Sequence, residues 1–217
     1  MDIDIRKFID NSLLRPHVDL KQVEDFVLRS SQIGFYAVCL HPYHIRFAYE
    51  LVGENIVLCS VVGFPLGLDT KEEKIHQAVG AVTSGAREID MVMNLSAFKS
   101  GNYGYVEEEI KAIKRETGAV LKVIIETHYL NEEEKIKATD ICASSGADFV
   151  KTSTGFAPTG ARVEDVKLLR SVAGNRLKVK ASGGIRDLRT ALAMIGAGAD
   201  RIGTSSGFEI YKEAVQG

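Results

Sequence analysis

Short apolar, β-branched segments alternate with longer amphipathic segments along the whole chain. The short segments predict eight strands, and no hairpin turn signal separates any two of them. Strand–helix alternation of this kind favours a parallel sheet. Eight units favour a closed (β/α)8 TIM barrel, one domain over residues 1–217, rather than an open doubly wound sheet. The expected strands cover residues 8–14, 35–40, 56–63, 87–93, 121–127, 147–153, 177–182 and 200–206.

Two amphipathic segments, residues 70–86 and 131–147, are typical of helices. The first follows Asp69 and Thr70, either of which is suited to cap a helix, and acidic residues occupy its first turn. Both segments end in a glycine followed by alanine, where the next strand is expected to begin.

The even-numbered strands share a local register. Each follows a glycine suited to a left-handed helix end, and the residue five positions later is Cys39, Asp90, Lys151 or Gly203. Because alternate barrel strands contribute one layer of inward side chains, these four residues are expected to share a layer. Gly203 would leave space in it, while Ile89 and Val150 would face the helices. The alternative is that the glycines mark helix–strand junctions and nothing more.

Composition narrows the function classes. The 217 residues are 45% hydrophobic and carry a formal net charge of −2, which suffices for one sizeable core. No basic tract points to nucleic acid, and no apolar run is long enough to cross a bilayer. The amino terminus lacks an apolar signal core, and the three cysteines show no CxxC spacing. We expect reduced thiols in a cytoplasmic protein.

Two lysines end apolar strand-like segments, Lys151 in ADFVKTSTGF and Lys180 in LKVKASGGIRD. If both point above the barrel, their ammonium groups repel each other, and one can become a neutral amine near pH 7. A Schiff-base enzyme requires such an amine. Lys151 is the better nucleophile, because it belongs to the even-strand layer and precedes a flexible turn; Lys180 is then its electrostatic partner. The alternative is that one lysine merely pairs with a carboxylate.

Asp90 is an acid inside an apolar strand. Between two ammonium groups it would stay ionised and relay protons through water, or it would form a buried ion pair with either lysine. Lys122 and Lys178 also occur in strand-like segments. If they point inward they need acidic partners, for which Glu88 and Glu126 are candidates.

Two glycine- and serine-rich loops follow the last two strands, residues 182–186 and 203–207. Phosphate sites of barrel enzymes are frequently built from these two loops and a helix amino terminus. Gly155 can add a backbone donor from the neighbouring loop. Arg186 would pair either with the phosphate or with a nearby helix acid.

Neither a metal nor a cofactor is expected. Histidines 41, 44, 76 and 128 lack metal-ligand spacing, and His41 and His44 favour a solvated loop or helix start. Cys39 is either a packed thiol or a group that contacts substrate.

The chain resembles deoxyribose-phosphate aldolases over nearly its whole length. The motifs appear in the family's order: AVCLHP, VVGFPLG, EIDMVMN, LKVIIET, ADFVKTSTGF, VKASGGIRD and RIGTSSG. The resemblance implies a class I aldolase that reversibly cleaves 2-deoxy-D-ribose 5-phosphate into D-glyceraldehyde 3-phosphate and acetaldehyde. It also implies that Lys151 forms the Schiff base, that Lys180 perturbs its ionisation and that Asp90 relays protons. Matching substrate positions are Ser12, Cys39, Thr152, Gly155, Gly183, Gly184, Arg186, Gly203, Ser205 and Ser206.

The chain departs from the family near its amino terminus. Where the family commonly has Asp-His-Thr-Leu-Leu-Lys-Pro, residues 10–16 read DNSLLRP, so Asn11 replaces a histidine and Ser12 keeps a hydroxyl. Some relatives use a tyrosine on a C-terminal tail, a role that Tyr211 cannot be given from its position.

The expected partner is a small phosphorylated sugar, with no nucleic acid and no membrane, and the chain is expected to form a homo-oligomer, a dimer or tetramer. The alternatives are another phosphosugar barrel enzyme, an isomerase or decarboxylase with an acidic lysine, and a non-catalytic phosphosugar-binding protein.

Overall fold

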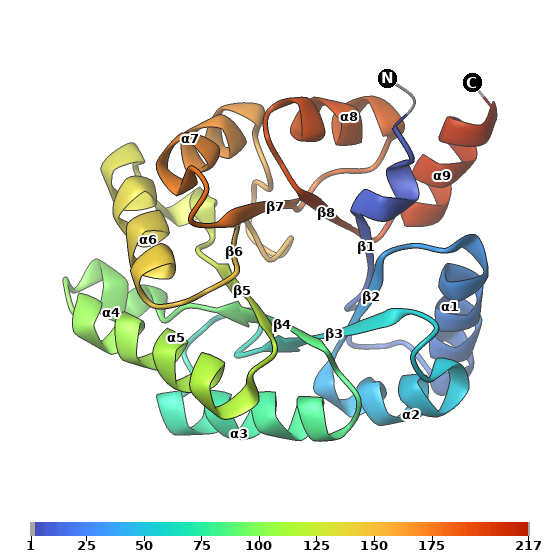
Figure 1. Ribbon diagram of the computed structural model, residues 1–217, viewed down its shortest axis with the longest axis horizontal. Helices are drawn as coiled ribbons and strands as arrows, with labels where there is room; N and C mark the ends of the chain where they lie inside the picture. The colour runs from blue at the N-terminus through green and yellow to red at the C-terminus, as the bar shows by residue number, and fades with distance from the viewer. Residues whose placement is uncertain (1–2, 217) are drawn as a thin grey trace.

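Eight parallel strands close into a barrel in the computed structural model, which describes residues 3–216, and helices surround the barrel (Figure 1). The strands follow sequence order, and β1 pairs with β8 to complete the ring. The predicted (β/α)8 TIM barrel is therefore confirmed. The strands are β1 (Ile9–Leu13), β2 (Ala37–Leu40), β3 (Val57–Val62), β4 (Glu88–Val92), β5 (Val120–Ile124), β6 (Phe149–Lys151), β7 (Lys178–Ser182) and β8 (Arg201–Thr204).

The helices lie outside the strands (Figure 1), and two short 3-10 turns occur, one before β1 and one between β5 and α6. The capping of α3 by Thr70 is confirmed, because its hydroxyl accepts from the backbone of Glu73 while the Glu73 carboxylate reaches back. The helical elements are η1 (Ile5–Phe8), α1 (Leu20–Ile33), α2 (Pro42–Val52), α3 (Lys71–Thr83), α4 (Leu95–Lys99), α5 (Tyr103–Thr117), η2 (Thr127–Tyr129), α6 (Glu132–Ser144), α7 (Val163–Ala173), α8 (Leu188–Gly196) and α9 (Gly207–Gln216).

The strands are shorter than the apolar segments that predicted them, most visibly in β5. The sequence extends this strand to residue 127, but it ends at Ile124 and Glu126 adopts a left-handed backbone, with φ 49°. Glu126 turns its carboxylate onto Thr154, whose backbone N–H donates to it over 3.1 Å. The turn η2 follows at once, so the last predicted strand positions belong to a loop at the barrel mouth.

The predicted side-chain register is correct. Ile89 and Val150 are fully buried in the apolar core that the strands share with the helices. Asp90 and Lys151, one position further along each strand, meet inside the barrel. All four glycines that set this register, Gly34, Gly85, Gly146 and Gly198, have positive φ at or just after a helix end.

Gly203 leaves the space predicted for it. A Cβ at this position would lie 2.9 Å from the Ser182 Cβ and 3.0 Å from the Lys180 Cε. Any larger residue would therefore force the side chains of Ser182 and Lys180 to shift.

No helix within residues 3–216 has the length and apolar character that a membrane crossing requires.

Candidate active site

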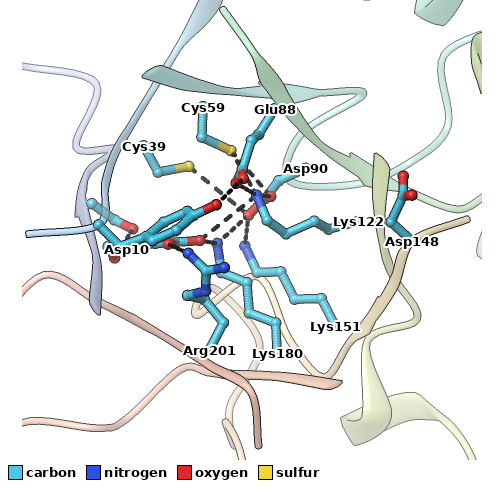
Figure 2. A network of polar contacts seen from close by, with 12 residues as sticks. Asp10, Cys39, Cys59, Glu88, Asp90, Lys122, Asp148, Lys151, Lys180 and Arg201 are labelled. Carbon is cyan, nitrogen blue, oxygen red and sulfur yellow. Dashed lines mark hydrogen bonds and ion pairs between the residues drawn. The ribbon is translucent and has the colours of Figure 1, made fainter. Parts of the chain in front are cut away.

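Asp90 lies at the centre of a network of charged side chains inside the barrel (Figure 2). Its Oδ2 atom accepts from Lys151 Nζ at 2.7 Å and from Lys180 Nζ at 2.8 Å. The two lysines come from neighbouring strands, β6 and β7, and are register partners. The ammonium groups thus converge on one oxygen, within the ~4–6 Å over which like charges disfavour each other.

A third lysine joins the network from β5. Lys122 Nζ lies 2.9 Å from Asp90 Oδ1 and 2.5 Å from Glu88 Oε2. The predicted alternatives for its acidic partner are thereby resolved in favour of Glu88, since Glu126 faces Thr154 instead. Lys178 has no place in this network, because its side chain is exposed and lies over the Phe149 ring.

The network continues from Lys180 toward the amino-terminal end of the barrel. Lys180 Nζ donates to Asp10 Oδ2 at 2.5 Å, and Asp10 Oδ1 accepts from Arg201 at 3.4 Å. The Arg201 guanidinium lies 3.2 Å from the centre of the Tyr36 ring, whose hydroxyl donates to Glu88. A ladder of alternating charge therefore runs along the barrel interior from Lys151 to Arg201.

Opposite charges outweigh burial in this network. Burial acts to raise the pKa of Asp90, but Lys122, Lys151 and Lys180 together hold that pKa well below its usual value. Burial acts to lower the pKa of Lys180, but Asp10 and Asp90 raise it above its ordinary range. The pKa of Lys122 is likewise raised by its carboxylate neighbours against the effect of burial. Asp90 therefore remains a carboxylate, and Lys122 and Lys180 remain ammonium groups, throughout the neutral pH range.

A cleft of about 240 Å³ opens above the network. Of the network's residues, Lys151 alone lines it, while Asp90 and Lys180 lie beneath. The two glycine- and serine-rich loops also line the cleft, with Gly183 and Gly184 both at positive φ. Helix α9 begins at Gly207, directly after the second loop. Backbone N–H groups of such loops and a helix amino terminus form the usual surroundings of a bound phosphate. The predicted residues that line the cleft are Ser12, Lys151, Gly155, Gly183, Gly184, Arg186, Gly203 and Ser205.

Three of the predicted substrate residues do not line this cleft: Cys39, Thr152 and Ser206. Thr152 is fully buried and ties β6 to β7, since its hydroxyl donates to the Ser182 carbonyl. Cys39 is also fully buried, with its sulfur 4.0 Å from Asp90 Oδ2. The backbone N–H of Ser206 donates to the hydroxyl oxygen of Thr204. Direct substrate contact by Cys39 or Thr152 is not supported by this arrangement.

The departures near the amino terminus lie on both sides of β1. Ser12 lines the cleft, whereas Asn11 points outward and its amide donates to Ser30 on α1. The change from histidine to asparagine therefore falls behind the barrel wall. Tyr211 also packs outside the barrel, edge-on to Phe35.

The histidines His41 and His44 stand at the start of α2, as predicted, but His44 is buried rather than solvated. Within residues 3–216, one group has the spacing of a metal site: Cys39, Cys59 and Asp90, whose ligand atoms all lie within 4.8 Å of one another. The Asp90 oxygens already accept from three ammonium groups, an arrangement that disfavours a further cation.

Sequence reasoning missed two members of the site. Asp10 and Arg201 belong to the network. Each stands in a segment with several other polar residues, so its type alone does not distinguish it in the sequence. The signal that could have found them is the strand period of two, because Asp10 precedes the inward Ser12 by two positions and Arg201 precedes Gly203 by two. Thr154, which lines the cleft, was also missed, whereas Thr204 lies there within the predicted loop 203–207.

Comparison with known proteins identifies the class to which this barrel belongs. Residues 4–213 match the DeoC/LacD family aldolases. A protein named deoxyribose-phosphate aldolase from Aquifex aeolicus is 58% identical over 212 residues, which cover 97% of this chain and 96% of that protein. A similarly named protein from Caldanaerobacter subterraneus is 51% identical, with 97% of this chain and 94% of that protein covered.

Solved structures give the same result. A structure titled "QR15, an Aldolase" superposes with a TM-score of 0.96 at 57% identity, covering 99% of this chain and 97% of that one. The tetrameric deoxyribose phosphate aldolase from Aeropyrum pernix superposes with a TM-score of 0.90 at 36% identity, covering 96% and 90%. The chain belongs to the DeoC/LacD aldolase family, and it is an aldolase.

Proposed function

We propose that this aldolase reversibly cleaves 2-deoxy-D-ribose 5-phosphate into D-glyceraldehyde 3-phosphate and acetaldehyde, through a Schiff base on Lys151. The observation that carries the proposal is the position of Lys151, which lines the cleft facing two phosphate-type loops while its amine rests on Asp90. The names of the relatives that match nearly the whole chain support this substrate.

The reaction begins when the free amine of Lys151 attacks the C1 carbonyl of the open-chain sugar, and loss of water gives an iminium ion. The C3 hydroxyl then loses its proton, and a carbonyl forms at C3 as the bond between C2 and C3 breaks. The electron pair of that bond becomes the double bond of an enamine, with the iminium nitrogen as electron sink. Glyceraldehyde phosphate leaves. Protonation of the enamine at C2 and hydrolysis release acetaldehyde and regenerate the lysine.

Asp90 and Lys180 serve these proton transfers from below the cleft. Asp90 shares one oxygen between both lysines, so a proton can pass along this contact and through water to the reacting carbons. The phosphate is held at the other end of the cleft by the N–H groups of Gly183, Gly184 and the start of α9, with Ser205 adding a donor. Arg186 also lines the cleft and adds positive charge.

The test is reduction with borohydride in the presence of 2-deoxyribose 5-phosphate. A stable adduct on the peptide that contains Lys151 is expected, and Lys151→Met should give none. An isomerase or decarboxylase that uses lysine as an acid would form no reducible imine. Turnover without any trapped adduct on Lys151 would therefore overturn the proposal, and so would binding without turnover.

We also propose that the enzyme acts in the cytoplasm and associates with copies of itself, as a dimer or tetramer. The three free cysteines support the first statement, and the tetrameric relative from Aeropyrum pernix supports the second. Light scattering of the purified protein would give the assembly size, and a monomer at micromolar concentration would contradict it.

A further inference from the structure

The charged groups inside the barrel are unequal in number. Among residues 3–216, three carboxylates and four cations make up the network: Asp10, Glu88 and Asp90 against Lys122, Lys151, Lys180 and Arg201. All seven have exposures of 6% or less. If every group were ionised, the barrel interior would carry one uncompensated positive charge, which is costly in a medium of low dielectric constant.

Beyond these seven groups, Glu126 is a buried carboxylate at the barrel mouth, but it bonds to Thr154 and forms no ion pair with the cations of the network. The remaining groups that face the network are neutral or exposed. Tyr36 contributes a hydroxyl, and burial raises the pKa of the Cys59 thiol, so that it keeps its proton. Lys178 stands in solvent at the amino-terminal end, and Arg15 and Arg186 are exposed at the rim of the cleft. Cys39 remains: a hydrogen bond from Cys59 lowers its pKa, yet its sulfur lies near the Asp90 carboxylate, which opposes a second negative charge.

The four cations differ in the number of carboxylates that they contact. Lys122 lies within 4 Å of three carboxylates, Glu88, Asp90 and Asp10. Lys180 bonds to two of these carboxylates, and Arg201 carries a guanidinium that does not deprotonate in proteins. Lys151 bonds to Asp90 alone, and it is the one network member that reaches the cleft.

We propose that Lys122, Glu88 and Arg201, none of which reaches the substrate, set the protonation of Lys151 by fixing the charge count of the barrel interior. Three carboxylates match three cations that stay protonated in the resting enzyme, and Lys151, the fourth, is then a free amine. The inference rests on the proposed function, since a free amine matters here as the nucleophile. Lys180 then acts as one of three compensating cations, rather than as the sole group that repels a proton from Lys151.

The proposal predicts opposite effects for two neighbouring residues. Lys122→Met removes a cation, so Lys151 must supply the missing charge, and the acid limb of the kcat/KM profile should move to higher pH. Glu88→Gln removes an anion, and the same limb should move to lower pH. Each displacement should be about one pH unit, the size expected for a unit charge several ångströms away. The double variant keeps one cation in excess and should return close to the wild-type profile.

The measurement is kcat/KM for cleavage of 2-deoxyribose 5-phosphate between pH 5 and pH 10. Because every variant is measured with the same substrate, the ionisation of the substrate cancels when the pH profiles are compared. A merely structural role would lower activity in both single variants without moving the limb, and this result would overturn the proposal. If Lys122→Met does not fold, Glu88→Gln decides alone. An acid limb at lower pH supports the charge count, and an acid limb at the wild-type pH overturns it.

Two further experiments test the charge of Cys39 and the Schiff-base mechanism separately. Cys39→Ser should leave the acid limb at the same pH, because the charge count treats this thiol as neutral. An acid limb at lower pH would show that Cys39 is a fourth anion and would overturn the charge count. Borohydride trapping tests the proposed function independently. An adduct on Lys151 with unmoved limbs means that only the charge count fails, whereas no adduct in the wild type means that the Schiff-base mechanism fails.

Discussion

Two fully buried charge clusters in this protein behave in opposite ways. One is the network around Asp90; the other is the pair of Lys74 on α3 and Glu109 on α5, outside the barrel, joined over 2.7 Å. In the pair, burial lowers the pKa of Lys74 and raises that of Glu109, and the single opposite charge does not overcome it. In the network, the pKa values of Asp90 and Lys180 move the other way, toward the charged forms.

The difference lies in the number of partners. Asp90 contacts the amino groups of three lysines, whereas Lys74 contacts one carboxylate and the carbonyl of Val92. Burial alone thus drives ionisable groups toward neutrality, and a crowded network can hold them charged. An enzyme that needs fixed charges beside one free amine gains from the second arrangement.

Lys151→Met should have the largest effect of the changes considered. This change removes the proposed nucleophile, so kcat/KM should fall by about 10³-fold or more. The remaining network has three cations for three carboxylates, and the free energy of unfolding should not decrease. Aldol cleavage in a coupled assay and urea denaturation check the two parts. A variant that is clearly less stable than the wild type would contradict the view that Lys151 is the surplus cation.

Breaking the other cluster should affect stability instead. Lys74→Met leaves the Glu109 carboxylate buried without its partner, and we expect a loss of about 3–5 kcal/mol in the free energy of unfolding. Lys74→Met combined with Glu109→Gln should lie within about 1 kcal/mol of the wild type, since both charges are gone. Lys111→Met on the exposed face of α5 is the matched control, with an expected loss below about 1 kcal/mol. A harmless Lys74→Met would show that the pair is already neutral.

The smallest effect is a difference in pH dependence. Glu109 has a raised pKa in the fold, so its contribution to stability falls as pH rises from about 4.3 through the folded value. Lys74 has a lowered pKa, so stability rises as pH climbs from that folded value toward about 10.4.

Four members of the network, Asp10, Asp90, Lys122 and Lys180, contribute no such slope at neutral pH, and a slope from a free amine at Lys151 would be the same in the wild type and in variants of the Lys74–Glu109 pair. The lowered pKa values of Asp10 and Asp90 matter only below about pH 4, and the raised values of Lys122 and Lys180 only above about pH 10. Urea midpoints from pH 4 to pH 10 should therefore show a shallow minimum in the wild type that the Lys74→Met/Glu109→Gln variant lacks. Equal curvature in both proteins would rule out the pair as its source.

Much of this site was predictable from the sequence, because regular spacings along the chain determine which strand residues point into the barrel. The left-handed glycines fix the register of the even strands, which places Asp90 and Lys151 in the barrel interior. The loops after β7 and β8 follow from the general architecture of barrels.

Two features were not predictable. Lys178 and Lys180 are two positions apart on one strand and share a face, but only depth along the barrel axis makes one exposed and the other buried. The choice between Glu88 and Glu126 as partner of Lys122 depends on where β5 ends. It ends through a positive φ at Glu126, a conformation that this residue type rarely adopts and the sequence does not signal.

The seam between β1 and β8 has a consequence for synthesis of the chain. Asp10 lies near the beginning of the sequence, and its charged partners Lys180 and Arg201 lie 170 and 191 positions later. During translation, Asp10 leaves the ribosome long before either partner exists. A growing polypeptide therefore cannot complete this charged network before residue 201 has emerged, so the network forms only when the ring closes.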